Sequence, residues 1–148
     1  MRRGRSRKSI DSLAILPLIN AGDDPDTEYL SDGITESIIN NLSQLPKLRV
    51  MARSTVFRYK GREVDPQIGG QQLNVRAVLT GRVLHREDLL ITKIELVDAD
   101  DGSHLWGEQY NRNLTDLLQM QTEISQEVSN RLRLRLTGVE QQQLARRY

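Results

Sequence analysis

One short segment of this sequence alternates basic and aromatic side chains in a way that could contact nucleic acid. Residues 53–62 read RSTVFRYKGR. Aromatic rings can stack on bases while neighbouring cations meet phosphates, but the segment does not match the aromatic submotif of RNA-recognition domains. A solvated loop whose two aromatic rings dock on the core explains the same residues, and we favour that interpretation. The candidate side chains are Arg53, Phe57, Arg58, Tyr59, Lys60 and Arg62.

Acidic side chains gather just after the first expected strand, where the sheets of α/β proteins often bind ligands. These are Asp23, Asp24 and Asp26, with Glu28 close behind. Carboxylate oxygens of this kind could hold a hard cation. Capping and solvation of a helix start account for the same residues more simply, so we predict neither a metal nor a cofactor.

Residue types that carry most enzyme chemistry are scarce in this chain. It has no cysteine, which excludes disulfides and thiolate nucleophiles, and its two histidines are His85 and His104. The motifs HExxH, GxSxG and GxGxxG do not occur, nor does a phosphate-binding GxxxxGK loop. We therefore predict that the protein is not an enzyme, with a triad assembled from distant positions as the alternative.

The net charge of +1 is unevenly distributed along the chain. Five cations precede the first acid, and with these set aside 16 basic residues stand against 20 acidic ones, a net charge of −4. An acidic body is a poor electrostatic match for phosphates. The basic start fits a disordered tail, which we favour, a cytoplasmic flank of a membrane helix outside this chain, or a nucleic-acid arm. Its cations are Arg2, Arg3, Arg5, Arg7 and Lys8.

The hydropathy of the sequence indicates neither a membrane-spanning helix nor a secretory signal. No apolar run approaches the roughly 20 residues that a spanning helix needs, and no apolar stretch follows the basic start as it would in a secretory signal. We therefore expect a cytoplasmic location, with a position next to a membrane helix outside this chain as the alternative.

Strands and helices are expected to alternate in the first half of the 148 residues. Residues 13–19 are almost wholly apolar and read as a buried strand. An Asp-Pro cap then opens an amphipathic helix over 25–45. A short strand is expected at 48–52, followed by irregular structure over 53–64.

The second half is expected to begin with a short helix that Asp65 opens and Asn74 closes. Strand periodicity follows at 75–86, 89–97 and 104–112, with tight turns between, which indicates an antiparallel meander. One face of the third of these strands should carry His104, Trp106 and Tyr110. Thr115 then caps a long helix whose buried stripe should be Leu117, Met120, Ile124, Val128 and Leu132.

The order of elements is therefore β-α-β-α-β-β-β-α. Helices between the first strands imply right-handed crossovers, and the meander adds antiparallel pairs. We predict an α/β fold with a mixed five-stranded sheet and helices packed on it.

Four runs of the sequence, in this order and spacing, resemble the TolB-like amino-terminal domain of bacterial adenylate cyclases, serine/threonine kinases and winged-helix regulators, which often precedes tetratricopeptide repeats. They are LAILPLINAGDDPDTEYLSDGITESIINNL at 13–42, LRVMARSTVFRYKG at 48–61, VRAVLTGRV at 75–83 and IELVDADDGSHLWGEQYNRNLTDLLQMQTEI at 94–124. The resemblance implies a three-layer α/β domain similar to the anticodon-binding fold. The chain departs from the family at IGGQQLNV, residues 68–75, where the family has an IGRELGV-like helix.

By this resemblance the chain is a non-catalytic regulatory or interaction module of a larger bacterial signalling protein; the alternative is a nucleic-acid-binding module that uses 53–62. The expected partners are other proteins or neighbouring domains: tetratricopeptide repeats, a kinase, a cyclase or a winged-helix domain. We expect no nucleic-acid partner, membrane contact only through an anchor outside this chain, and leave the oligomeric state open. Residues 1–9 are predicted to be a basic tail, 10–137 the domain, and 138–148 a linker or the start of another helix.

Overall fold

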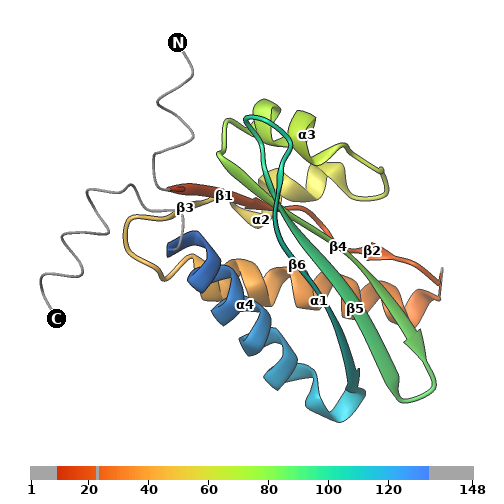
Figure 1. Ribbon diagram of the computed structural model, residues 1–148. Coiled ribbons are helices and arrows are strands. Elements are labelled where there is room, and N and C mark those ends of the chain that lie inside the picture. The colour runs from red at the N-terminus through yellow and green to blue at the C-terminus, as the bar shows by residue number, and fades with distance from the viewer. Residues whose placement is uncertain (1–9, 23, 134–148) are drawn as a thin grey trace, which may run out of the picture.

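A mixed six-stranded sheet lies at the centre of the structure (Figure 1). The computed structural model describes residues 10–22 and 24–133, so the predicted tail and the predicted C-terminal linker lie outside the described residues. The strand order is β3-β1-β4-β5-β6, with β2 also paired to β4. Pairs among the first four strands are parallel, and the last three strands form an antiparallel meander. The strands are β1 (Ser12–Ile15), β2 (Ile19–Asn20), β3 (Arg49–Val50), β4 (Ala77–Arg86), β5 (Leu89–Asp98) and β6 (His104–Asn113).

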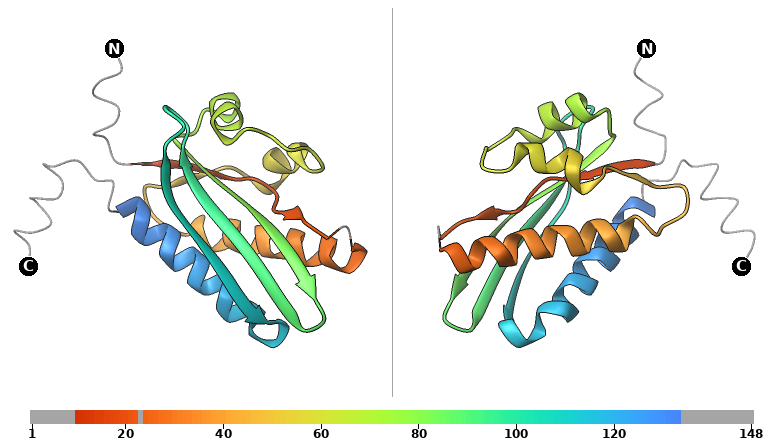
Figure 2. Two further views of the ribbon diagram at one scale, coloured as in Figure 1. Left: turned by 45° about the vertical axis from the view of Figure 1, so that its right-hand side comes forward. Right: turned by 180° about the vertical axis from the view of Figure 1, so that it is seen from behind.

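Two long helices cover one face of the sheet, and short helices cover part of the other face (Figure 2). α1 and α4 pack against each other, α1 beneath β4 and α4 beneath β6. α3 lies across the other face on β4 and β5, with α2 close by. The helices are α1 (Pro25–Leu42), α2 (Arg53–Val56), α3 (Pro66–Leu73) and α4 (Leu117–Arg133), with 3₁₀ turns at Phe57–Tyr59 and Leu114–Asp116. The predicted α/β class and mixed sheet are confirmed, whereas the likeness to an anticodon-binding fold stays a prediction.

Pro17 divides the first predicted strand in two, which is why the sheet has six strands rather than five. The residue before it still donates its N–H to Leu79 O at 3.0 Å, and the N–H of Leu18 turns away from the sheet to Thr35 Oγ1 of α1, also at 3.0 Å. Proline has no N–H to continue a ladder. Pairing with β4 resumes only at β2.

Both predicted Asp-Pro helix starts are confirmed. Asp24 Oδ1 accepts the N–H of Asp26, and Asp65 Oδ1 accepts the N–H of Gln67, each at 3.0 Å. Each carboxylate satisfies one of the N–H groups that the first turn of a helix leaves without a partner. Asn74 closes α3 in the left-handed conformation, at φ 58°, as predicted. α1 ends at Leu42, three residues before the predicted end.

The prediction of irregular structure at 53–64 is wrong for its first half. Arg53–Val56 is one turn of α-helix and Phe57–Tyr59 one turn of 3₁₀-helix. Val56 is fully buried, and the rings of Phe57 and Tyr59 pack against the core cluster. Elements this short carry no readable periodicity, so tertiary burial decides their conformation.

The prediction that His104 shares a face with Trp106 and Tyr110 is also wrong. Trp106 lies opposite Leu96, but His104 lies opposite Val97, because the register of β6 shifts by one residue at a bulge. A slip of one residue sends a side chain to the other face of a sheet. Trp106 and Tyr110 are buried towards the helices, whereas the His104 side chain is 59% exposed.

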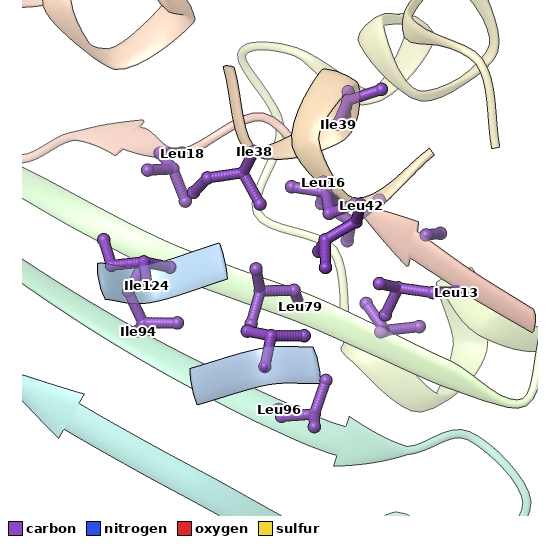
Figure 3. Packing of buried hydrophobic residues seen from close by; sticks show 14 of the residues in the cluster. Leu13, Leu16, Leu18, Ile38, Ile39, Leu42, Leu79, Ile94, Leu96 and Ile124 are labelled. Atoms are coloured by element: carbon purple, nitrogen blue, oxygen red, sulfur yellow. The ribbon is translucent and has the colours of Figure 1, made fainter. Parts of the chain in front are cut away.

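The core lies between the sheet and the two long helices. Leu79, Ile94 and Leu96 of the sheet join side chains of α1 and α4 in one cluster (Figure 3). On α4, Met120, Ile124 and Val128 are fully buried and Leu132 nearly so, as the predicted stripe requires, while Leu117 at its start is half-buried.

Candidate functional site

The basic and aromatic segment 53–62 lies against an acidic stripe on α1. Glu28, Asp32 and Glu36 are spaced four residues apart and so project from one side of that helix. Lys60 Nζ lies 2.9 Å from Glu28 Oε2 and also pairs with Asp32. Arg53 Nε lies 2.5 Å from Glu36 Oε2. Two of the four candidate cations are therefore already neutralised within the fold.

The two aromatic rings of the segment are also engaged. The Arg53 guanidinium lies 4.0 Å from the centroid of the Phe57 ring, and that of Arg62 lies 5.6 Å from the centroid of the Tyr59 ring. The Tyr59 hydroxyl donates to Gln72 Oε1 of α3 at 2.8 Å. Both rings are therefore half-buried, and each already has a guanidinium close to it, which leaves less of its surface for a base to stack on.

Arg58 and Arg62 are the cations of the segment that remain directed towards solvent. Arg58 Nε donates to the carbonyl of Thr55 at 3.2 Å, and Arg62 Nη2 donates to the carbonyl of Arg58 at 2.6 Å. These bonds fix the backbone turn and leave both charges without an acidic partner among the described residues. An anion at this surface would therefore contact two arginines, and not the four cations and two aromatic rings that the sequence suggested.

The pKa values of the paired groups follow this geometry. Hydrogen bonds from Lys60 and Asn20 hold the pKa of Glu28 below its ordinary value, in spite of partial burial. Burial alone would lower the pKa of Lys60, but its hydrogen bonds to Asp32 and Glu28, with their charges, outweigh burial and raise that pKa. The lowered pKa of Glu28 and the raised pKa of Lys60 keep these two groups charged at neutral pH.

Among the described residues, the acidic side chains after the first strand lie at the start of α1. Asp24 caps α1, and Asp26 supplies the N–H that this cap accepts. Asp23 lies outside the described residues. Across residues 10–22 and 24–133, no group of three or more histidine, aspartate or glutamate side chains is arranged to hold a metal ion.

A groove lined by both charged and apolar residues, which the sequence did not reveal, crosses the face of the sheet that the long helices leave open. It has a volume of about 620 Å³ and runs between the loop at 63–66 and strands β4, β5 and β6. Arg82 pairs with Glu63 on one side, and His104 Nδ1 lies 3.0 Å from Glu95 Oε2 on the other. The signal in the sequence is the alternation of charged residues with apolar ones along β5, although it does not say that three strands and a loop converge there.

A second charged cluster is structural. Arg76 Nη2 lies 3.2 Å from Asp98 Oδ2, and its Nε lies 3.1 Å from Asp100 Oδ2, with all three side chains largely buried. The pairs fasten the turn between β5 and β6 to the beginning of β4.

In the part of the chain that the structure describes, no helix is both long enough and apolar enough to cross a membrane.

Sequence comparison connects the chain to a family of regulators. The family described as "HilA/YgeH-like transcriptional regulator, second domain" matches residues 8–142. A protein of Rhizobium meliloti (strain 1021) named "Putative adenylate cyclase 3" is 39% identical over 131 residues, which are 88% of this chain and 22% of that protein. The chain thus spans less than a quarter of the length of that relative.

Solved structures share the fold at low sequence identity. TolB from Acinetobacter baumannii superposes with a TM-score of 0.60 at 16% identity, over 84% of this chain and 29% of TolB. Lipoprotein GNA1162 from Neisseria meningitidis superposes with a TM-score of 0.58 at 22% identity, over 81% of this chain and 97% of the lipoprotein. With the sequence matches, these structures confirm the resemblance to the TolB-like amino-terminal domain of cyclase and regulator proteins.

Proposed function

Because the chain belongs to the family of HilA/YgeH-like transcriptional regulator second domains, we propose that it is a non-catalytic regulatory module of a larger signalling protein. The observation that carries this proposal is the match over residues 8–142 to a domain that forms one part of a regulator. The relative from Rhizobium meliloti supports it, because the matched segment is 22% of a much longer protein with a cyclase name.

The geometry of the candidate site agrees with a module that works by contact. Its charged side chains serve packing: Lys60 and Arg53 join the 53–62 segment to α1, and Arg76 fastens a turn. We propose that its partners are other proteins or domains of the same polypeptide, in the class of a cyclase, a kinase, a winged-helix domain or tetratricopeptide repeats. The proposed location is the cytoplasm, with any membrane contact made by an anchor outside this chain.

The proposal is tested in the Rhizobium meliloti relative, where the matched segment can be deleted or exchanged for residues 10–137 of this chain. Cyclic-nucleotide formation is measured for the intact protein, the deletion and the chimaera. We expect the deletion to change activity several-fold and the chimaera to return it towards the intact level. The proposal fails if deletion leaves activity and its regulation unchanged, or if the isolated chain itself forms product.

A second candidate function is nucleic-acid binding by the 53–62 segment. The observation that favours it is the exposure of Arg58 and Arg62 without an acidic partner in the described part of the chain, together with the transcriptional-regulator name of the family. Pairing of Arg53 and Lys60 with α1 weighs against it, because a nucleic-acid surface depends on uncompensated cations.

A further inference from the structure

The sheet ends on one side in a long edge strand. β6 is ten residues long and, among the described residues, pairs with β5 alone, whereas the strand at the opposite edge, β3, has two residues. Figure 2 shows β6 running along the full outer margin of the sheet. Its free side is therefore the largest stretch of unpaired strand backbone among the described residues.

The hydrogen-bond pattern determines which residues of β6 direct their backbone outwards. The N–H of Leu114 donates to the carbonyl of Asp88 at 2.8 Å, and bonded and non-bonded pairs alternate along an antiparallel ladder. It follows from the register that the residues bonded to β5 are Trp106, Glu108, Tyr110 and Arg112. The outward N–H and C=O groups belong to Gly107, Gln109, Asn111 and Asn113.

This edge has few of the features by which proteins block strand addition. Such features are prolines, edge lysines, bulges and covering loops. β6 contains no proline and no lysine, and its bulge lies at its very beginning, opposite Leu96 and Val97. From Trp106 onwards the register is regular, and Gln109, Asn111 and Asn113 are exposed.

The side chains of the edge make it complementary to a second copy of itself. In an antiparallel pair about a two-fold axis at Tyr110, Glu108 lies opposite Arg112 of the other copy, and Gln109 lies opposite Asn111. Opposite charges in such directly facing pairs are stabilising. A two-fold axis at Gln109 or at Asn111 instead places Glu108 opposite Tyr110 or Leu114.

The two charges remain available for such a pair. Glu108 is exposed and has no ion pair within residues 10–22 and 24–133. Arg112 gives one Nη2 contact to Glu123 at 2.6 Å and one long Nη1 contact to the carbonyl of Asn111 at 3.3 Å. A guanidinium has five N–H donors in a planar fork, so it can also donate to a second carboxylate.

We propose that two copies of this chain associate through their β6 strands, antiparallel and centred on Tyr110, to form one continuous sheet. The interface is of the same-patch type that two-fold dimers use. This proposal stands on strand geometry and charge, and it holds or fails independently of the proposed regulatory function.

Sedimentation velocity of the whole chain over a concentration series tests the association. We expect a dimer at concentrations of about 10–100 μM, the range for a modest interface. Glu108→Arg should shift the protein to monomer, and the charge exchange Glu108→Arg with Arg112→Glu should return the dimer. Lys93→Glu is the matched control, because it changes the charge by as much on the neighbouring strand and should leave the dimer intact. A wild-type chain that stays monomeric throughout overturns the proposal.

Disulfide trapping tests the register directly, because the chain has no cysteine of its own. Residues 108 and 112 form a non-bonded facing pair with Cα atoms about 4.5 Å apart, which a disulfide can span. We expect Glu108→Cys and Arg112→Cys chains to cross-link when mixed and oxidised. Neither should cross-link alone, since identical residues lie about 14 Å apart along the strands at 3.4 Å per residue. Equal cross-linking in the single-variant samples, or none in the mixture, contradicts the register.

Discussion

At the scale of single residues, Lys60 is one of the two side chains that join the 53–62 segment to α1, and it contacts two of the three acids there. Lys60→Gln leaves Glu28 and Asp32 without their cation, and we expect a loss of about 1 kcal/mol, since the groups are partly exposed. The measurement is chemical denaturation at pH 7. Lys60→Arg should retain most of the stability, and Lys93→Gln, an exposed cation elsewhere on the sheet, should cost almost nothing. An equal loss for the two glutamine variants would contradict this role of Lys60.

The pH dependence of the same pair has a defined sign. The pKa of Glu28 is lower in the folded chain than its ordinary value of 4.5. A lowered acid pKa stabilises the fold above the ordinary value and ceases to do so as pH falls through the folded value. We therefore expect the stability difference between wild type and Lys60→Gln to be constant from about pH 6 to pH 9 and to shrink below about pH 4. A difference that persists undiminished at pH 3 would contradict it.

In contrast to Lys60, the buried Tyr110 hydroxyl has no hydrogen-bond partner among residues 10–22 and 24–133. Burial, and then the charges of Glu127, Glu108 and Glu123, raise its pKa to about 12, with Arg112 opposing them. A raised pKa means stability that is present below pH 10 and lost as pH rises towards 12. Tyr110→Phe should be neutral at pH 7 to within about 0.5 kcal/mol and should remove the last step of a spectrophotometric tyrosine titration. A clear destabilisation at pH 7 would mean that the hydroxyl has a partner.

The roles of single residues could be predicted from the sequence where a side chain interacts only with backbone a few positions away. Asp24 and Asp65 cap helices and Asn74 adopts the left-handed conformation, because caps depend on the adjacent backbone only. The pairing of Lys60 with Glu28 joins residues 32 positions apart and has no local signal. For the same reason the sequence revealed the candidate basic segment, but not that two of its cations form ion pairs with acids of α1.

At the scale of elements, α4 offers a matched pair of substitutions on one helix. Ile124 is fully buried against the sheet, whereas Leu118 is 76% exposed. We expect Ile124→Ala to cost on the order of 2–5 kcal/mol, the range for truncating a buried aliphatic side chain, and Leu118→Ala to change stability by less than about 0.5 kcal/mol. Thermal unfolding of both variants checks this. Equal melting temperatures would sink the assignment of the buried face.

Long elements were predictable from their periodicity, whereas the break at Pro17 and the turns at 53–59 were not. The periodicity of α1, α4 and the meander extends over ten residues or more, enough to distinguish a helix from a strand. Pro17 splits one expected strand and the turns at 53–59 replace an expected loop, in both cases because single contacts in the core decide the backbone. The bulge that turns His104 to the open face has no signature in the sequence; only the register of the folded strands shows it.

At the scale of the whole molecule, the class of fold followed from the order of elements, but the sheet order did not. The periodicity of β1 and β3 shows that each is a strand, and nothing in it shows that β1 lies between β3 and β4. The open groove arises only once the sheet order and α3 are set, since its walls come from five separate segments: β2, residues 63–66, β4, β5 and β6. Its residues could be identified only in the folded chain.

The distribution of charge over the folded chain also predicts how tightly it binds nucleic acid. With Arg53 and Lys60 paired to α1, we expect fluorescent single-stranded DNA or RNA to bind more weakly than about 100 μM at physiological salt. Neutralising the stripe with Glu28→Gln, Asp32→Asn and Glu36→Gln frees both cations. Fluorescence anisotropy should then show tighter binding, with a log–log salt slope steeper by about 1.4, the value for two further phosphate contacts on a single strand. Circular dichroism confirms that this variant is folded. The opposite result would be sub-micromolar binding by the wild type that Phe57→Ala and Arg58→Ala abolish. Such binding would make nucleic acid the partner, because it would show that the ion pairs with α1 break when the protein binds phosphates.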